Sequence, residues 1–227
     1  AAGCVVHAVD TKLGGASHDV LRSSVGTPIL EDVRAGRYDA VFVATPCSSY
    51  SVRHDPPLRD CDQPEGLLPL PEGWGAYINK HNRLAEFTAR VLDACSASAT
   101  PAALENPADR ADDESRAHWP AFSRHGSLWR MPSITAALGA ANAGFHTFAQ
   151  CALGSPAQKW TTIACVGCMC GALAGLNTPR FACHHGGQAH AEVLTGRDAL
   201  GRSRTGMAAA YPREMNEYLT RAIVSAA

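Results

Sequence analysis

The sequence has little net charge, no long apolar run and no leader-like start, and each absence narrows the class of protein. A formal net charge of -1 over 227 residues excludes a chain that is basic throughout, so any contact with nucleic-acid phosphates must come from a local patch. No run of about 18 apolar residues occurs, and we expect no membrane span. The opening AAGCVVHAVD lacks a basic start followed by an apolar stretch, which disfavours a signal peptide.

What is present is an ordinary hydrophobic content and an unusual set of cysteines. Apolar residues make up 46% of the chain, which suits one α/β domain with a well-buried core. The nine cysteines are an odd number, and several crowd into one short region. This pattern favours a reduced, intracellular compartment with catalytic or metal-binding thiols over a secreted disulfide framework.

Strand and helix patterns alternate along the chain, which predicts a mainly parallel sheet with helices packed on both faces. Apolar and β-branched runs bounded by turn residues mark the strands, and apolar residues at helical spacing mark the helices. A segment with five prolines reads as a long surface loop at 55–75. We expect strands at 4–10, 19–21, 39–45, 102–105, 146–153 and 160–166, and helices at 78–95, 133–142 and 212–224.

Three reactive side chains follow predicted strands. Asp10, Cys47 and Glu105 each lie at or just beyond the carboxyl end of one. Ligands of open α/β sheets bind at that edge. The pattern alone therefore predicts a site that contains these three residues.

Cys47 has two chemical interpretations. With Arg53 it forms C-x5-R after a strand, a spacing that lets a thiolate and a guanidinium share one phosphate, as in cysteine phosphatases. The intervening SSYSV has no glycine to let backbone N–H groups converge on an anion. Pro56 and Pro57 also interrupt any helix that should follow. The phosphatase interpretation is therefore the weaker one.

The second interpretation uses three motifs in order, namely TPCSSYS, LENP and QCALGSPAQKWTTI. Together they resemble the DNA cytosine-5 methyltransferase family, in its divergent short form. In that family a Pro-Cys dipeptide after a strand carries the nucleophile, a Glu-Asn dipeptide ends the next strand, and a Gln-plus-basic motif lies on two further strands. The resemblance covers most of the chain. It implies a Rossmann-like, class I S-adenosylmethionine-dependent methyltransferase fold.

The resemblance also implies roles for individual residues. Cys47 would attack C6 of a cytosine flipped out of DNA, and Glu105 would hold the ring at N3, so that C5 can accept a methyl group from S-adenosylmethionine. Asp10 would bind the ribose of the cofactor and Asp19 its adenine. The remaining matches are Thr45 beside the cofactor, Pro46 shaping the turn and beside the cofactor, Asn106 in the Glu-Asn dipeptide, and Gln150 and Lys159 in the Gln-plus-basic motif. DNA as substrate implies a nucleus or nucleoid.

The Phe-x-Gly-x-Gly signature of the family is missing, and the sequence starts nine residues before Asp10. The resemblance therefore predicts a core at 1–164 that lacks its first strand and leaves two central strands poorly partnered. A reduced target-recognition-like insert follows at 165–205, and a helix at 206–227 returns to the core. A degenerate methyltransferase fold that only binds its partner is the alternative.

The predicted insert contains two further clusters. One is basic and could hold phosphates or simply be solvated; its members are Arg197, Arg202, Arg204 and Arg213. The other combines thiols and imidazoles in C-x2-C and C-H-x5-H spacings; its members are Cys165, Cys168, Cys170, Cys183, His184, His185 and His190. The spacing fits no standard zinc finger, so a structural zinc stays open and no ligand is assigned. Cys151 reads as an ordinary small hydrophobe or surface thiol.

Overall fold

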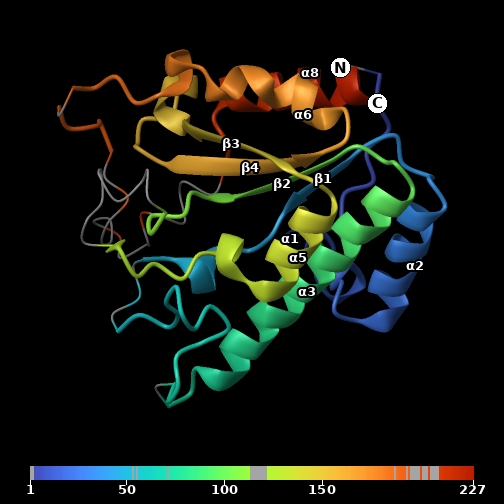
Figure 1. The fold of residues 1–227 in the computed structure, drawn as a ribbon, viewed down its shortest axis with the longest axis horizontal. Coiled ribbons are helices and arrows are strands. Elements are labelled where there is room, and N and C mark those ends of the chain that lie inside the picture. Colours follow the sequence, from blue (N-terminus) through green and yellow to red (C-terminus); the bar gives the residue numbers. More distant parts are fainter. Residues whose placement is uncertain are drawn as a thin grey trace.

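The chain forms a four-stranded sheet between two layers of helices (Figure 1). The structure is a computed structural model. It describes residues 3–52, 54, 56–70, 72–112, 122–186, 188–192, 194, 200, 204 and 210–227. The α/β class expected from the alternating pattern is confirmed.

The sheet is mixed rather than mainly parallel, which corrects the prediction. Its strands are β1 (Val41–Ala44), β2 (Ala102–Pro107), β3 (Gly144–Ala149) and β4 (Trp160–Val166), in the spatial order β1-β2-β4-β3. β1 and β2 are parallel, whereas β4 runs antiparallel to both β2 and β3. Only residues 150–159 join β3 to β4, and a parallel pair needs a crossover of about a dozen or more residues.

Helices cover both faces of the sheet, as predicted. The described helices are α1 (Thr11–Gly14), α2 (Ser23–Arg34), α3 (Gly75–Ala97), α5 (Pro132–Ala140), α6 (Met169–Leu173) and α8 (Arg213–Ala226). Short 3-10 turns connect them at η1 (Gly15–His18), η2 (Ser48–Tyr50), η4 (Leu128–Arg130), η5 (Gln150–Leu153), η6 (Ala174–Asn177) and η7 (Pro179–Phe181). α3, α5 and α8 confirm the three predicted helices.

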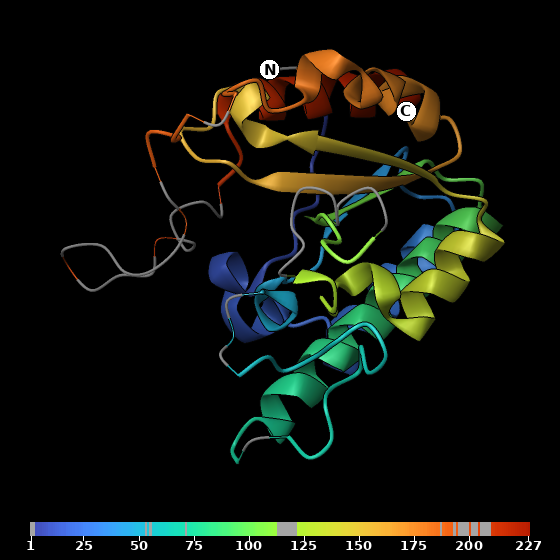
Figure 2. The same cartoon turned by 60° about the vertical axis from the view of Figure 1, so that its left-hand side comes forward.

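Each face of the sheet has its own hydrophobic core, because successive strand residues point to opposite sides. Leu104 of β2 packs with apolar residues of α2, α3 and α5. The preceding residue, Ala103, packs with apolar residues of α6 and α8. Figure 2 shows the two helical layers separated by the sheet.

Two predicted strands at the start of the chain are wrong. Residues 4–10 form no strand, and Val5 and Val6 are exposed. Residues 19–21 form a turn. Apolar composition alone does not make a strand, which also needs a neighbouring edge to pair with. Among the described residues β1 is paired on one side only, with β2.

Helix α2 was not predicted, because Gly26 and Pro28 lie inside it. A side chain at Gly26 would meet the Val20 carbonyl oxygen at 2.3 Å and the Phe87 ring at 2.9 Å. The glycine is therefore required for α2 to pack closely against α3, although glycine disfavours helix formation. Packing here outweighs local preference.

Candidate active site

Cys47 lies in a turn directly beyond the carboxyl end of β1. The strand ends at Ala44, and η2 begins one residue after Cys47. The Tyr50 N–H donates to the Cys47 carbonyl at 3.0 Å, and the Tyr50 side chain is buried. Cys47 itself is exposed. The turn is thus anchored in the core while it presents a thiol at the surface.

Thr45 ties this turn to β2 and α3. The Asn106 side-chain amide donates to the Thr45 carbonyl at 2.7 Å, and the Thr45 and Thr88 hydroxyls lie 2.7 Å apart. All three residues are buried, and leaving such a group without a partner costs about 1–3 kcal/mol. Because Asn106 directly follows Glu105, this bond fixes the Cys47 turn relative to the glutamate. Asn106 is therefore a positioning residue.

Glu105 lies on β2, where it pairs in register with Ala44 at the end of β1. The residue is 5% exposed. Its Oε2 accepts a hydrogen bond of 2.8 Å from the Tyr211 hydroxyl. Its Oε1 is buried and has no hydrogen-bond partner among the residues that the structure describes. A buried carboxyl oxygen without a partner is costly in a folded protein, so this atom is available to a ligand that can satisfy it.

Burial favours the neutral forms of both reactive groups, and the nearby Lys159 charge opposes it. Burial raises the pKa of Glu105, although the Lys159 charge and the Tyr211 hydrogen bond act in the opposite direction. Burial likewise raises the pKa of Cys47; Lys159 lowers this pKa and Glu105 raises it. Cys47 has surface open to solvent, yet the protein atoms around it still disfavour a thiolate. The two groups therefore influence each other's ionisation.

Gln150 and Lys159 flank the β3–β4 connection, as the third motif predicted. The Gln150 N–H donates to the Lys159 carbonyl at 2.9 Å, and the buried Gln150 side chain donates to the Thr161 hydroxyl at 2.8 Å. The Lys159 Nζ lies 5.7 Å from the centre of the Tyr211 ring. Lys159 therefore supplies positive charge at the site, whereas the Gln150 side chain stabilises the start of β4 through its hydrogen bond to Thr161.

Tyr211 is a site residue that the sequence did not reveal. It immediately precedes Pro212 and α8, far along the chain from Glu105, and its ring packs edge-on against Phe42 of β1. Burial raises the pKa of Tyr211, and the charge of Glu105 adds to this effect. The phenol therefore remains a neutral donor to the carboxyl group. Only a Tyr-Pro dipeptide before the last helix could have drawn attention to it.

A second group of side chains supports the segment that follows Cys47. The Tyr77 hydroxyl donates to the Ser48 Oγ at 2.9 Å, and His81 Nε2 lies 3.0 Å from the same oxygen. The other nitrogen of His81 donates to the Tyr77 carbonyl at 2.9 Å. Burial lowers the pKa of His81, so the neutral ring accepts from Ser48. The His54 ring nitrogen donates to the Ser48 carbonyl at 2.9 Å.

Asp10 and Asp19 flank the α1–η1 segment, whose Lys12 is near enough for its charge to lower the pKa of Cys47 against the larger effect of burial. Asp10 is exposed and caps α1, where its Oδ1 accepts from the Lys12 N–H at 2.7 Å. Asp19 Oδ1 accepts from the Leu21 N–H at 3.1 Å. Both carboxylates are thus used in local turns. The cofactor-binding roles that the resemblance implies for Asp10 and Asp19 stay predictions.

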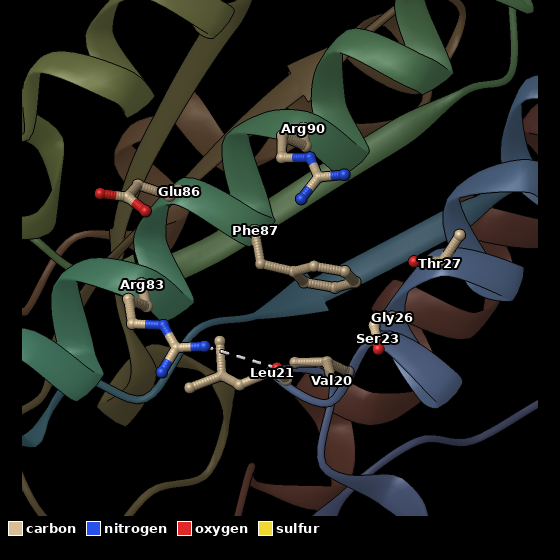
Figure 3. A pocket seen from close by; sticks show the side chains of 9 residues that line it. All are labelled: Val20, Leu21, Ser23, Gly26, Thr27, Arg83, Glu86, Phe87 and Arg90. Atoms are coloured by element: carbon tan, nitrogen blue, oxygen red, sulfur yellow. Dashed lines mark hydrogen bonds between the residues drawn. The ribbon is translucent and has the colours of Figure 1, made fainter.

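Two cavities lie elsewhere. One of about 210 Å³ (Figure 3) separates the start of α2 from α3 and is lined by Val20, Leu21, Ser23, Gly26, Thr27, Arg83, Glu86, Phe87 and Arg90. Another of about 270 Å³ borders the segment after Cys47, from Ser49 to Val52. Neither is lined by Cys47 or Glu105, and both are smaller than the ~300–1,000 Å³ typical of small-molecule sites. The chemistry of the side chains, rather than cavity size, therefore marks the candidate site.

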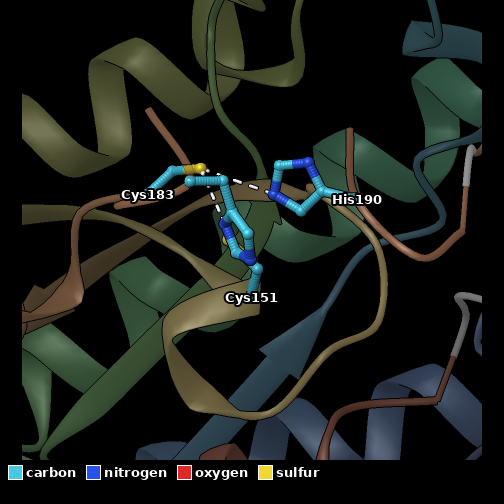
Figure 4. A group of neighbouring side chains, drawn as sticks. Cys151, Cys183 and His190 are labelled. Atoms are coloured by element: carbon cyan, nitrogen blue, oxygen red, sulfur yellow. Dashed lines mark hydrogen bonds between the residues drawn. The ribbon is translucent and has the colours of Figure 1, made fainter. Parts of the chain in front are cut away.

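The predicted Cys/His ligands separate into two groups. Cys183, His185 and His190 converge, and Cys151 joins them in place of the cysteines predicted from spacing (Figure 4). The Cys165 thiol instead donates to the Gly144 carbonyl. Cys168 donates to the Ala226 carbonyl, and His184 to the Pro179 carbonyl. Burial raises the pKa of the Cys165 thiol, and the neighbouring Cys170 adds to this effect.

The predicted basic cluster is only partly described. Arg197 and Arg202 lie outside the described residues, as does Arg53 of the C-x5-R pattern. Arg213 is exposed and pairs with Glu217 at 2.8 Å, one helical turn away. Its charge is therefore partly matched within α8.

No family model matches this chain, and neither the curated proteins nor the solved structures include a significant match. Among the described residues, no helix combines the length and apolar character that crossing a membrane requires. The functional assignment therefore depends on the geometry above and on the motifs.

Proposed function

We propose that the chain carries the base-attacking site of a DNA cytosine-5 methyltransferase, in which Cys47 adds to C6 of a flipped-out cytosine and Glu105 engages N3. The observation that carries this proposal is the position of the two groups at the ends of adjacent parallel strands, with Glu105 Oε1 buried and unpartnered. A cytosine N3 brought to that oxygen would satisfy it. The order and placement of the three motifs support the same assignment.

The chemistry of a pyrimidine explains why both groups are needed. C5 of cytosine is a poor nucleophile until a thiolate has added to C6. In that step a C–S bond forms and the electrons of the C5–C6 double bond move into the ring, where N3 takes a proton from neutral Glu105. Burial raises the pKa of Glu105, which favours the protonated form that can supply this proton. Elimination of the thiolate later restores the double bond.

The methyl donor implied by the family is S-adenosylmethionine, which supplies an electrophilic methyl group. Asp10 and Asp19, which should hold it, make local side-chain hydrogen bonds among the described residues. We therefore derive the reaction for the base alone. The same observation favours a second candidate, a methyltransferase-fold module that binds a nucleobase without methylating it.

A phosphatase role for Cys47 is disfavoured by charge. Glu105 is near enough for its charge to raise the pKa of the Cys47 thiol. An ionised Glu105 would repel a phosphate group bound to Cys47, whereas a protonated Glu105 can donate to cytosine N3. The site is better matched to a base than to an anion.

Exchange of the C5 hydrogen tests the proposed step without a methyl donor. After thiolate addition, C5 can take a proton from water, lose its original hydrogen and release the thiol, with no redox partner. We expect DNA labelled with deuterium at cytosine C5 to lose label in the presence of the protein but not of C47S. Absence of exchange over varied sequences would contradict the attack on C6. Methylation after addition of S-adenosylmethionine would separate the enzyme from the binding module.

A further inference from the structure

Four side chains from two segments meet beside the β3–β4 connection. Cys151 comes from η5, and Cys183, His185 and His190 come from the chain after η7 (Figure 4). Their potential ligand atoms all lie within 4.8 Å of one another. The Cys183 sulfur lies 3.4 Å from His185 Nδ1 and 3.4 Å from His190 Nε2. All four residues belong to the described part of the chain.

These distances match the edges of a metal-centred tetrahedron. With Zn–S of about 2.3 Å and Zn–N of about 2.0–2.1 Å, a tetrahedral ion places sulfur and nitrogen ligands roughly 3.5 Å apart. The His185 and His190 ring centres are 4.1 Å apart and tilted by 46°, so the rings are not stacked in parallel. Cys151 and Cys183 are free thiols. The arrangement is that of ligands around one missing centre rather than of a packed core.

The ligand set identifies the class of ion. Two thiolates and two imidazoles in a tetrahedral arrangement suit Zn²⁺, whereas Mg²⁺ and Ca²⁺ require oxygen ligands. Four protein ligands leave no open position, which is typical of a structural site rather than a catalytic one.

Neighbouring contacts hold the ligand segments in place. The Gln158 side chain donates to the Cys183 sulfur at 3.5 Å, an outer contact typical of metal-bound thiolates. The Glu192 N–H donates to the Pro156 carbonyl at 3.0 Å, and Ala157 forms a bridge with Glu192. The strand-like contact brings the segment that carries His190 onto the β3–β4 connection.

We propose that Cys151, Cys183, His185 and His190 bind one structural zinc ion that links η5 to residues 183–190. The site is independent of the proposed function. Its position has a consequence for that function, because Cys151 directly follows Gln150 and Gln158 directly precedes Lys159. The ion would therefore stiffen the connection that carries Lys159 to the candidate active site.

Metal analysis of the full chain, purified under reducing conditions without chelator, tests the site. We expect about one zinc per chain, with loss of most of it in C151S and in C183S. C168S is the matched control, because Cys168 belongs to the rival set of ligands predicted from spacing and lies outside the cluster; it should keep its zinc. A metal-free wild type, zinc unchanged in C151S and C183S, or equal loss in C168S would overturn the proposal.

A second measurement needs no variant and so does not depend on variant folding. Co²⁺ loaded into wild-type protein in place of zinc should give the visible absorption of a tetrahedral ion together with thiolate-to-metal charge transfer. An octahedral spectrum without charge transfer, or a Cys151–Cys183 disulfide in the reduced preparation, would also overturn it.

Discussion

Two cysteine-bearing regions are linked to the β3–β4 connection, one through Lys159 and the other through Cys151, and their neighbours give them different chemistry. Cys47 has a carboxyl group and a lysine charge near it, while the phenol of Tyr211 holds Glu105. Cys183 has imidazoles and a second thiol. A thiol with a lysine charge nearby and a carboxyl group that can supply a proton is suited to add to a base, whereas thiols that share a centre with imidazoles are suited to bind metal. The comparison shows that the surroundings, and not the cysteine, assign the role.

The largest effect should separate the two regions completely. C47S should lower C5 hydrogen exchange by at least about 10³-fold, since the covalent step is lost, yet leave the zinc content unchanged. C183S should lose zinc and keep the Cys47 thiol reactive toward DNA at reduced rate. Exchange assays and metal analysis on both variants check this. If both variants lost both properties, the regions would be one site.

Removing the acidic proton should be the next largest effect. E105Q should lower exchange by about 10²–10⁴-fold, because an amide cannot pass a proton to N3. The melting temperature should hold or rise, since a buried ionisable group is replaced by a neutral one. Exchange rates and thermal melts measure the two properties. A loss of exchange accompanied by unfolding would instead make Glu105 structural.

The pH dependence of C5 hydrogen exchange tests the role of the Lys159 charge. The active form needs a Cys47 thiolate and a protonated Glu105, and the Lys159 charge lowers the pKa of both groups. Removing the charge in K159A should raise both pKa values, so the bell-shaped exchange profile should move to higher pH. K159R keeps the charge and should keep the profile. An unchanged pH profile in K159A would show that the Lys159 charge does not influence the ionisation of Cys47 or Glu105.

The smallest effect should come from Tyr211. Y211F loses the hydrogen bond to Glu105, which contributes on the order of 1 kcal/mol to stability. Because that bond lowers the pKa of Glu105, the glutamate limb of the profile should move to higher pH. Denaturant titration and the pH profile measure both. If that limb did not move, Tyr211 would contribute packing alone and would not influence the pKa of Glu105.

The sequence predicted the elements that carry the strongest local patterns. The β-branched run of β1 and the helical spacing of α3 were recognised, and with them the turn at Cys47. The strand at 102–105 was recognised as well, which placed Glu105. These parts of the candidate site follow from period and turn chemistry alone.

The parts that failed depend on contacts between distant segments. The run 4–10 is apolar enough for a strand but has no described strand partner. Gly26 suggested a loop instead of helix α2, because a glycine is needed there for packing against Phe87. Tyr211 and Cys151 were missed for the same cause, since each acquires its role only from residues far away in sequence. Spacing alone therefore could not show that Cys151 lies beside Cys183, His185 and His190.

Trapping on DNA that contains 5-azacytosine tests the central claim most directly. The ring nitrogen at position 5 makes C6 more electrophilic, so a thiol adduct should form without any methyl donor. We predict a denaturant-stable protein–DNA adduct whose digested peptide carries the base on Cys47, and no such adduct with C47S. An adduct on another cysteine, or none at all while the chain remains folded, would contradict the account.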